Sequence, residues 1–227
     1  HARNHVPSAM NSKPLGLPAK EMHRHIAYDI GAEGLSLALG LLLQAPVLCS
    51  NFSRLVIDPN RGEDDPTLLM KLYDGTIIPT NRHADATEVT RRLNTYYRPY
   101  HQAYAKLATP IRAIIAIHSF TPQLKGRQPR PWEIGILFAK DRRLAEPTIA
   151  GLQSRGDLTV GTNEPYDGHL PGDSIDQHAL RNGRLNILIE VRNDLIESSK
   201  GQQAWARLLA PILQQALAST KTSKAGE

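Results

Sequence analysis

The chain has 227 residues, of which 41% are hydrophobic and 22% charged, and its formal net charge is +5. This composition is ordinary for a soluble globular protein with one sizeable α/β domain, and no apolar run reaches the ~18 to 20 residues that a membrane span needs. The basic residues are spread out and only three Phe and two Trp are available for stacking, which argues against nucleic acid as a partner. The single cysteine, Cys49, excludes an internal disulfide and fits a reducing, cytoplasmic compartment.

The N-terminal part of the chain predicts loops around one helix. Residues 1–7 are polar and end in proline, so we expect a loop that follows a strand upstream of His1, and the sequence leaves open a signal peptide before it. A helix is expected from about Ala27 to Leu43, with Asp29 at its start, where a capping carboxylate would lie. The segment 62–81 is rich in Asp, Gly, Pro and Thr and predicts a long loop of a kind that is often functional.

The remaining elements alternate between strands and helices. Strands are expected at 47–49, 113–117, 132–138, 159–161 and 185–192. Helices are expected at 86–108, 144–154 and 201–218. This alternation predicts a single three-layer α/β/α domain with a mixed, largely buried sheet, phosphorylase/hydrolase-like in class. The domain would span residues 1–218, without the upstream strand, and residues 219–227 would form a flexible tail.

His118 follows the strongest strand pattern of the chain. Ile114, Ile115 and Ile117 form a β-branched apolar run that is typical of a strand buried on both faces. The carboxyl ends of strands line the ligand crevice in open α/β sheets, so a histidine at this point is well placed for chemistry. A histidine that only caps the strand end through backbone hydrogen bonds is the alternative.

A metal site without cysteine must use histidine and carboxylate ligands. A hydrolytic zinc site needs about three such ligands, a water molecule and a nearby carboxylate base. His118 and His1 lie in loops expected to follow strands, and Asp29 could approach both. Glu190, at the end of the other strong strand, would be the base, because apolar neighbours can raise a carboxyl pKa toward neutrality.

Each of these residues also has a structural interpretation. Asp29 could be a plain helix cap, and Glu190 could be an ion-pair partner of Arg192 or Arg54. His101 lies in a tyrosine-rich helix and is expected to serve packing.

Seven blocks of the chain resemble, in order, the N-formylglutamate amidohydrolase family. They are His1–Pro7, Tyr28–Ala32, Phe52–Arg61, Asp74–Thr76 with Ile78–Pro79, Ile117–Pro122, Asn163–Tyr166 and Ile189–Leu195. The resemblance extends from His1 to about Leu213, and the Ser-Arg-Leu-Val-Ile-Asp-Pro-Asn-Arg block is its most specific part. The family is similar in its α/β fold to zinc carboxypeptidases and zinc cell-wall amidases.

The resemblance implies a metal-dependent amidohydrolase that acts on the linear amide of a small N-acyl amino acid, such as N-formylglutamate. It places one Zn²⁺ on three ligands, His1, Asp29 and His118, and the catalytic carboxylate at Glu190. The substrate-binding candidates that it implies are Arg54, Arg61, Asn60, Arg192 and His178.

Several alternatives to this assignment stay open. Arg54 and Arg61 would clamp substrate carboxylates as bidentate forks, or else form structural ion pairs with Asp58 or Glu63. His178 and Tyr166 would stabilise an oxyanion or close the pocket, although loop solubility explains them equally well. A zinc amidase of peptidoglycan or peptide, and a non-catalytic binding domain on the same scaffold, are the competing functions.

Overall fold

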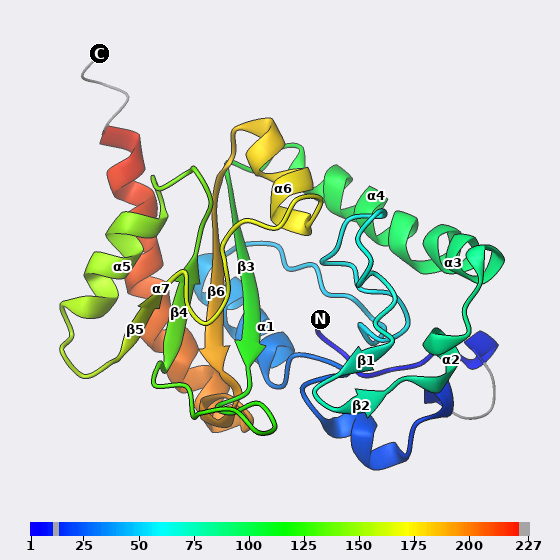
Figure 1. Ribbon diagram of the computed structural model, residues 1–227. Coiled ribbons are helices and arrows are strands. Elements are labelled where there is room, and N and C mark those ends of the chain that lie inside the picture. The colour runs from blue at the N-terminus through cyan, green and yellow to red at the C-terminus, as the bar shows by residue number, and fades with distance from the viewer. Residues whose placement is uncertain (11–13, 223–227) are drawn as a thin grey trace.

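The computed structural model describes residues 1–10 and 14–222. Its centre is a four-stranded mixed sheet in the order β3-β6-β4-β5 (Figure 1). The strands are β3 (Ala113–Phe120), β6 (Leu185–Arg192), β4 (Ile134–Leu137) and β5 (Val160–Thr162). β3 and β6 are parallel, β4 is antiparallel to β6, and β5 is parallel to β4. The predicted single α/β domain with a mixed, largely buried sheet is confirmed.

Side chains of the sheet alternate between two apolar layers. Ile187, Ile189 and Val191 of β6 belong to the main core, which α1 (Ala32–Leu43), α5 (Ala145–Gln153) and α7 (Ser199–Thr222) cover. Residues at the intervening positions point to the opposite face, because side-chain direction alternates along a strand. On that face Ile114 packs with residues of α4 (Arg98–Ala108) and α6 (Ser174–His178). His118 and Glu190 share the face of Ile114, which sets them apart from the main core.

The N-terminal third packs as a second apolar cluster beside the sheet (Figure 1). Its regular elements are short: 3₁₀ turns Ser8–Met10, Pro14–Gly16 and Ala19–His23, β1 (Leu72–Tyr73), β2 (Thr76–Ile77), α2 (Pro79–Arg82) and α3 (Ala86–Arg92). Leu55, Ile57 and Tyr97 are fully or almost fully buried in this cluster. The burial holds an otherwise irregular backbone in place against the sheet.

Several predicted boundaries differ from the structure. Residues 47–49 are extended but pair with no described strand, so the strand expected there is wrong. The loop expected over 62–81 contains the β1–β2 hairpin and α2. The helix expected over 86–108 is continuous, with a π turn at Leu93–Tyr97 between α3 and α4.

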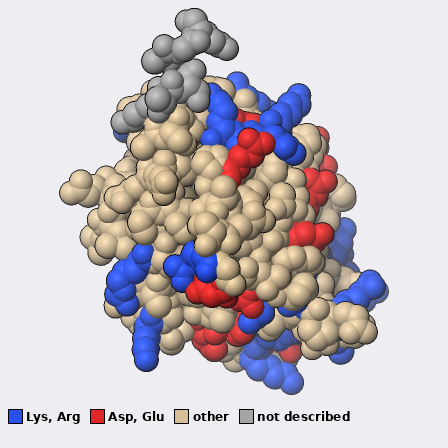
Figure 2. All heavy atoms as spheres, turned by 90° about the vertical axis from the view of Figure 1, so that its left-hand side faces the viewer, with Lys and Arg blue, Asp and Glu red and all other residues tan. Residues whose placement is uncertain are grey.

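The C-terminal helix is longer than predicted. α7 runs to Thr222, so Ser219–Thr222 continue the helix, and the rest of the predicted tail, 223–227, lies outside the described residues. No described helix is both long and apolar enough to cross a membrane. On the face over α5 and α7, basic and acidic side chains are interspersed with uncharged surface (Figure 2).

The start of α1 determines where Asp29 lies. The N-cap is Gly31, which adopts the left-handed conformation with φ 80° and makes no side-chain cap. A Cβ at Gly31 would lie 2.1 Å from the carbonyl oxygen of Ile196, so only glycine fits this turn. The helix therefore begins at Ala32, not at Ala27, and the interpretation of Asp29 as a plain helix cap is wrong. Its carboxylate contacts the rings of His1 and His118.

Candidate metal centre

His1, Asp29 and His118 meet beside the end of β3. Oδ2 of Asp29 lies 2.7 Å from Nδ1 of His118 and 3.2 Å from Nδ1 of His1. One potential ligand atom from each residue lies within 4.8 Å of those of the other two. Both imidazoles thus present the same nitrogen to a single carboxylate, and the residues come from positions 28 and 89 residues apart in the chain.

Backbone hydrogen bonds bring the first residue of the chain to the sheet. The amide of Asp29 donates to the carbonyl of His1 at 2.9 Å, and the amide of Ser53 donates to the carbonyl of His5 at 2.8 Å. The hydroxyl of Ser119 donates to the carbonyl of Ile30 at 2.8 Å, which ties the strand end to the segment before α1. The three elements of the cluster are therefore fixed to each other by main-chain contacts.

A second carboxylate, Asp58, orients the ring of His1 from the other side. Nε2 of His1 lies 2.5 Å from Oδ1 of Asp58. Arg54 in turn donates to Oδ2 of Asp58 through Nη2 at 2.9 Å and to Oδ1 of Asp29 through Nη1 at 3.3 Å. A carboxylate that accepts the outer N–H of a histidine fixes its tautomer and leaves the inner nitrogen free for a metal. Sequence reasoning considered Asp58 only as an ion-pair partner of Arg54 and missed this contact.

The pKa values of the cluster follow from burial and from these charges. Burial and Arg54 act to lower the pKa of His1, but Asp58 and Asp29 outweigh them and the net shift is upward. Burial lowers the pKa of His118, and Asp29 offsets this only in part. The pKa of Asp29 falls well below its usual value although burial opposes the shift, because both imidazoles stabilise its anion. The pKa of Asp58 is likewise depressed against burial, chiefly by Arg54 and His1.

Glu190 stands next to this cluster as a buried carboxyl group. It is the register partner of His118 in the parallel β3–β6 pair, and only 6% of the residue is exposed. Its Oε2 has no hydrogen-bond partner among the described residues. Burial and the charge of Asp29 raise its pKa well above the usual value, and Arg54 and Arg130 oppose that shift. The interpretation as an ion-pair partner of Arg192 or Arg54 does not hold, since neither forms an ion pair with Glu190 in the described structure.

This donor set fits a divalent metal such as zinc. Two imidazole nitrogens and one carboxylate oxygen are the ligand types that hydrolytic zinc sites use, with a further position left for water. The unpartnered oxygen of Glu190 supplies an acceptor of the kind that such a water would need. Both parts of the fit rest on residues that the fold brings together from four separate segments.

Of the predicted substrate-binding residues, Arg54 is already bound by two carboxylates, whereas Asn60 and Arg61 lie next to one of them, Asp58. Arg54 is only 10% exposed in its side chain and its fork is taken by Asp29 and Asp58. Arg61 and Asn60 lie just behind Asp58: the amide of Asn60 donates to Oδ1 of Asp58 at 2.9 Å, and Arg61 donates to the carbonyl of Asn60 at 2.8 Å. Arg61 forms no ion pair with a described carboxylate.

Arg192 and His178 have partners outside the cluster. Arg192 pairs with Asp194 at 2.9 Å and lies 3.7 Å from Glu133. His178 stacks on Tyr104 and shares a 2.8 Å contact with the ring of His101. The structure therefore does not place either residue in contact with the three ligand candidates, whereas the predicted packing role of His101 agrees with its burial.

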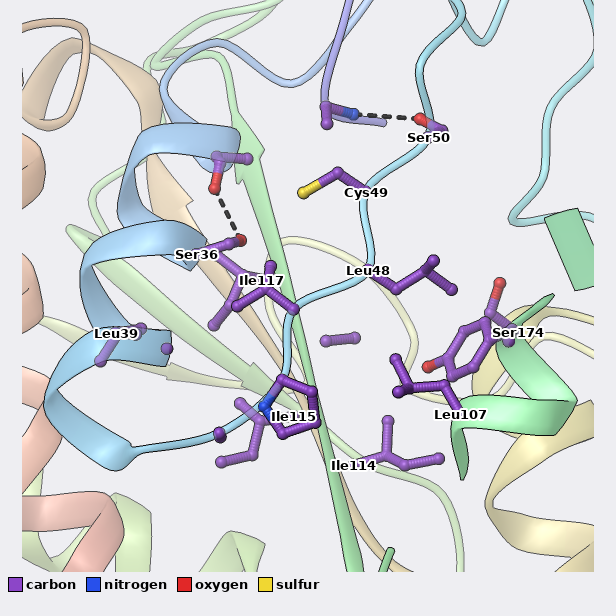
Figure 3. Close-up of a pocket in the computed structure, with 18 of the residues that line it drawn as sticks. Ser36, Leu39, Leu48, Cys49, Ser50, Leu107, Ile114, Ile115, Ile117 and Ser174 are labelled. Carbon is purple, nitrogen blue, oxygen red and sulfur yellow. Dashed lines mark hydrogen bonds between the residues drawn. The ribbon is translucent and has the colours of Figure 1, made fainter. Parts of the chain in front are cut away.

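An apolar cavity of about 260 Å³ lies along β3 (Figure 3). His1 and His118 are among the residues that line it. Ile115 and Ile117 of β3 form part of its wall, and Leu48 and Cys49 face them from the extended segment before Ser50. Leu107 of α4 closes part of another side. The cavity lies on the edge of β3 that has no partner among the described strands.

Comparisons with known proteins identify the family and the fold. The family model described as N-formylglutamate amidohydrolase matches residues 1–197. A crystal structure of a gene product of Agrobacterium tumefaciens is 34% identical, with a TM-score of 0.91 over 97% of this chain and 89% of that one. An N-formylglutamate amidohydrolase from Ralstonia eutropha JMP134 is 23% identical, with a TM-score of 0.61 over 86% of this chain and 83% of that one, and shows the likeness in fold. Comparison with curated proteins gives no match.

Proposed function

The chain belongs to the N-formylglutamate amidohydrolase family, and from this premise we propose that it hydrolyses the amide bond of a small N-acyl amino acid with one zinc ion held by His1, Asp29 and His118. The observation that carries the proposal is the position of Glu190, a buried carboxyl group with an unpartnered oxygen beside a three-ligand cluster. A hydrolytic site needs both the ligand cluster and a carboxylate base. In a purely structural ion-pair network, that oxygen of Glu190 would be expected to have a hydrogen-bond partner.

Zinc, when bound, would polarise the amide carbonyl and make a water molecule acidic enough to attack it. Glu190 would accept the proton that this water loses as its oxygen bonds to the carbonyl carbon. As the carbon–nitrogen bond breaks, Glu190 would pass the proton to the leaving nitrogen, giving a carboxylic acid and an amino acid. A carboxyl group with a raised pKa suits both transfers, because its affinity for the proton lies closer to working pH.

Asp58 and Arg54 would hold the ligands in their binding geometry. Asp58 accepts the Nε2 hydrogen of His1, so the lone pair of Nδ1 faces Asp29. Arg54 links Asp58 to Asp29, and its burial keeps this link out of competition with water. We therefore place Arg54 in support of the metal ligands, and we keep Arg61 and Asn60 as candidates for contact with substrate.

The decisive experiment combines metal analysis with an amidase assay on formyl, acetyl and peptidyl amino acids. We expect about one zinc per chain and turnover that a chelator abolishes and zinc restores. Glu190→Gln should keep the zinc but lose about 10² to 10⁴-fold in kcat, the range for a positioned general base. Glu146→Gln changes an exposed side chain of α5, is the matched control and should behave as wild type.

Two results would contradict the proposal. Full turnover by Glu190→Gln would remove the assigned base. Protein purified without chelators that holds no metal and hydrolyses none of the panel would point instead to a binding domain on this scaffold.

A further inference from the structure

Arg130 is fixed in position at the end of the loop between β3 and β4. Its amide donates to the carbonyl of Pro122 at 2.8 Å. Its guanidinium carbon lies 5.5 Å from the ring centroid of Phe120 and 5.0 Å from that of Tyr166. Stacking against two aromatic rings holds the guanidinium plane in one orientation, so little side-chain freedom remains to be lost when it binds a ligand.

The two rings place Arg130 on the face of the sheet that carries the metal cluster. Phe120 follows His118 by two positions in β3, so both side chains point to the same side. The charge of Arg130, together with that of Arg54, opposes the rise in the pKa of Glu190 that burial and Asp29 cause. Glu190 and Arg130 also act in opposite senses on the pKa of Tyr166. Arg130 therefore lies within electrostatic reach of the catalytic carboxyl group.

The fork of Arg130 has one edge without a protein acceptor. Nη1 donates to the carbonyl of Thr121 at 3.1 Å and to the hydroxyl of Tyr166 at 3.1 Å. Within residues 1–10 and 14–222, no acceptor is in hydrogen-bond contact with Nε or Nη2, and no carboxylate forms an ion pair with this arginine. Arg54 shows the opposite arrangement, because two carboxylates fill its fork.

An unfilled Nε–Nη2 edge matches the two oxygens of a carboxylate. Two parallel N–H groups in a fixed plane bind such a group bidentately, which a lysine cannot reproduce. Arg130 is only partly buried and Tyr166 is 38% exposed, so a small molecule can reach this edge. Asp29 is anionic and belongs to the metal cluster, whereas Arg130 carries a positive charge that no described carboxylate pairs with.

We propose that Arg130, held between Phe120 and Tyr166, binds a carboxylate of the N-acyl amino acid through its Nε–Nη2 edge and so selects acidic substrates. This inference rests on the proposed amidohydrolase function and adds the residue that recognises the substrate. Arg130 orients the substrate so that its amide carbonyl faces the metal ligands and Glu190.

The test measures discrimination between an acid and its amide in Arg130→Gln and Arg130→Lys. The substrates are N-formylglutamate and its two monoamides, one at the α-carboxylate and one at the side-chain carboxylate. We expect kcat/KM for N-formylglutamate to fall on the order of 100-fold in Arg130→Gln, because a charged fork contact is lost. The monoamide that lacks the recognised carboxylate should lose less than about 3-fold, and Arg130→Lys should fall between the two.

Arg127→Gln is the matched control. Arg127 lies in the same loop, is exposed, and its side chain makes no ion pair with a described carboxylate. It should keep the wild-type preference for the acid. An equal loss on the acid and on both monoamides in Arg130→Gln, or no loss on any of them, would overturn the assignment.

A binding measurement separates this inference from the catalytic one. Calorimetric titration with glutarate, a dicarboxylate that has no amide to cleave, needs no turnover. We expect Arg130→Gln to weaken glutarate binding on the order of 10- to 100-fold relative to the wild type and to Arg127→Gln. Unchanged binding, or no glutarate binding by the wild type, would overturn the role of Arg130 even if the amidase is active. A chain that binds glutarate through Arg130 but cleaves nothing would reject the proposed function alone.

Discussion

Two pairs of histidine side chains are buried in the described structure, and they differ in whether carboxylates contact them. His1 and His118 share Asp29, and Asp58 lies on the outer side of His1. His101 and His178 contact each other at 2.8 Å with no carboxylate bound to either ring in the described structure. Instead, Tyr97 packs at a tilt against His101 and Tyr104 stacks on His178.

The difference in surroundings is clearest in the pKa values of His1 and His101. The pKa of His1 rises despite burial because two carboxylates stabilise its cation. Burial lowers the pKa of His101 to about 4, and the charge of His178 adds to the effect. Nε2 of His101 faces the carbonyl of Pro59 and must carry the hydrogen, so Nδ1 accepts from His178 and both rings are neutral. Burial alone makes a histidine structural, whereas burial with shared carboxylates makes a site for a cation.

The largest expected effect comes from removing the shared carboxylate. Asp29→Asn removes the carboxylate whose Oδ2 contacts both imidazoles. Zinc affinity should therefore fall by more than the roughly 10- to 100-fold loss expected when a residue that only supports a ligand is changed. Competition with a chromogenic chelator measures the affinity, and turnover should fall with it. Asp157→Asn, whose carboxylate forms an exposed ion pair, is the control. Retention of wild-type zinc affinity by Asp29→Asn would exclude this residue as a ligand.

A smaller loss of zinc affinity is expected when Asp58, which supports the ligand His1, is changed. Asp58→Asn keeps the shape and an acceptor for Nε2 of His1 but removes the charge that Arg54 and His1 share. Zinc affinity and kcat/KM should each fall roughly 10- to 100-fold, while His101→Gln should leave zinc affinity as in the wild type. Comparable losses in the two variants would show that the two histidine pairs do not differ in the way that their carboxylates suggest.

The smallest effect concerns stability and pH at the second pair. The pKa of His101 is lower in the folded chain than the unfolded value of 6.5, so between pH 6.5 and about 4 the unfolded state binds more protons. Stability is therefore lost as pH falls through this window, by at most roughly 3 kcal/mol, because a tenfold change in proton affinity corresponds to about 1.4 kcal/mol. Urea unfolding at pH 7 and pH 5 should show a shallower loss for His101→Gln than for the wild type or for His83→Gln, which changes an exposed histidine. An identical loss of stability between pH 7 and pH 5 in the wild type and both variants would contradict the role of His101 in this pH dependence.

The sequence predicted the strongest strands well because their signal is local. β6 has the predicted bounds, Leu185–Arg192. β3 begins at Ala113 as predicted but runs past residue 117 to Phe120, so His118 lies within the strand and not in the loop expected after it. β6 is buried on both faces and β3 is buried or partly buried along its length, so most positions carry an apolar side chain that marks the element. The resemblance to the amidohydrolase family is also confirmed, since it depends on short motifs that are readable without a structure.

Short elements and cap positions were predicted less well because distant contacts define them. Residues 47–49 have strand-like composition but find no partner in the described sheet. The start of α1 depends on the close approach of Ile196 to Gly31, which lies 165 positions earlier in the chain. Because the helix begins after Gly31, Asp29 is not its cap and lies in the site instead. Neither effect leaves a signal in a short window of sequence.

The sequence by itself determined the ligand types and their placement near strand ends, because histidine and carboxylate chemistry and the direction of a strand are local properties. Only the tertiary structure decided which partners each group has. In the fold, Asp58 contacts His1 across 57 residues of sequence, and the guanidinium of Arg54 is bound by carboxylates. One oxygen of Glu190 and the Nε–Nη2 edge of Arg130 have no described partner. Hydrogen bonds and charges act through space, and the fold alone sets those distances.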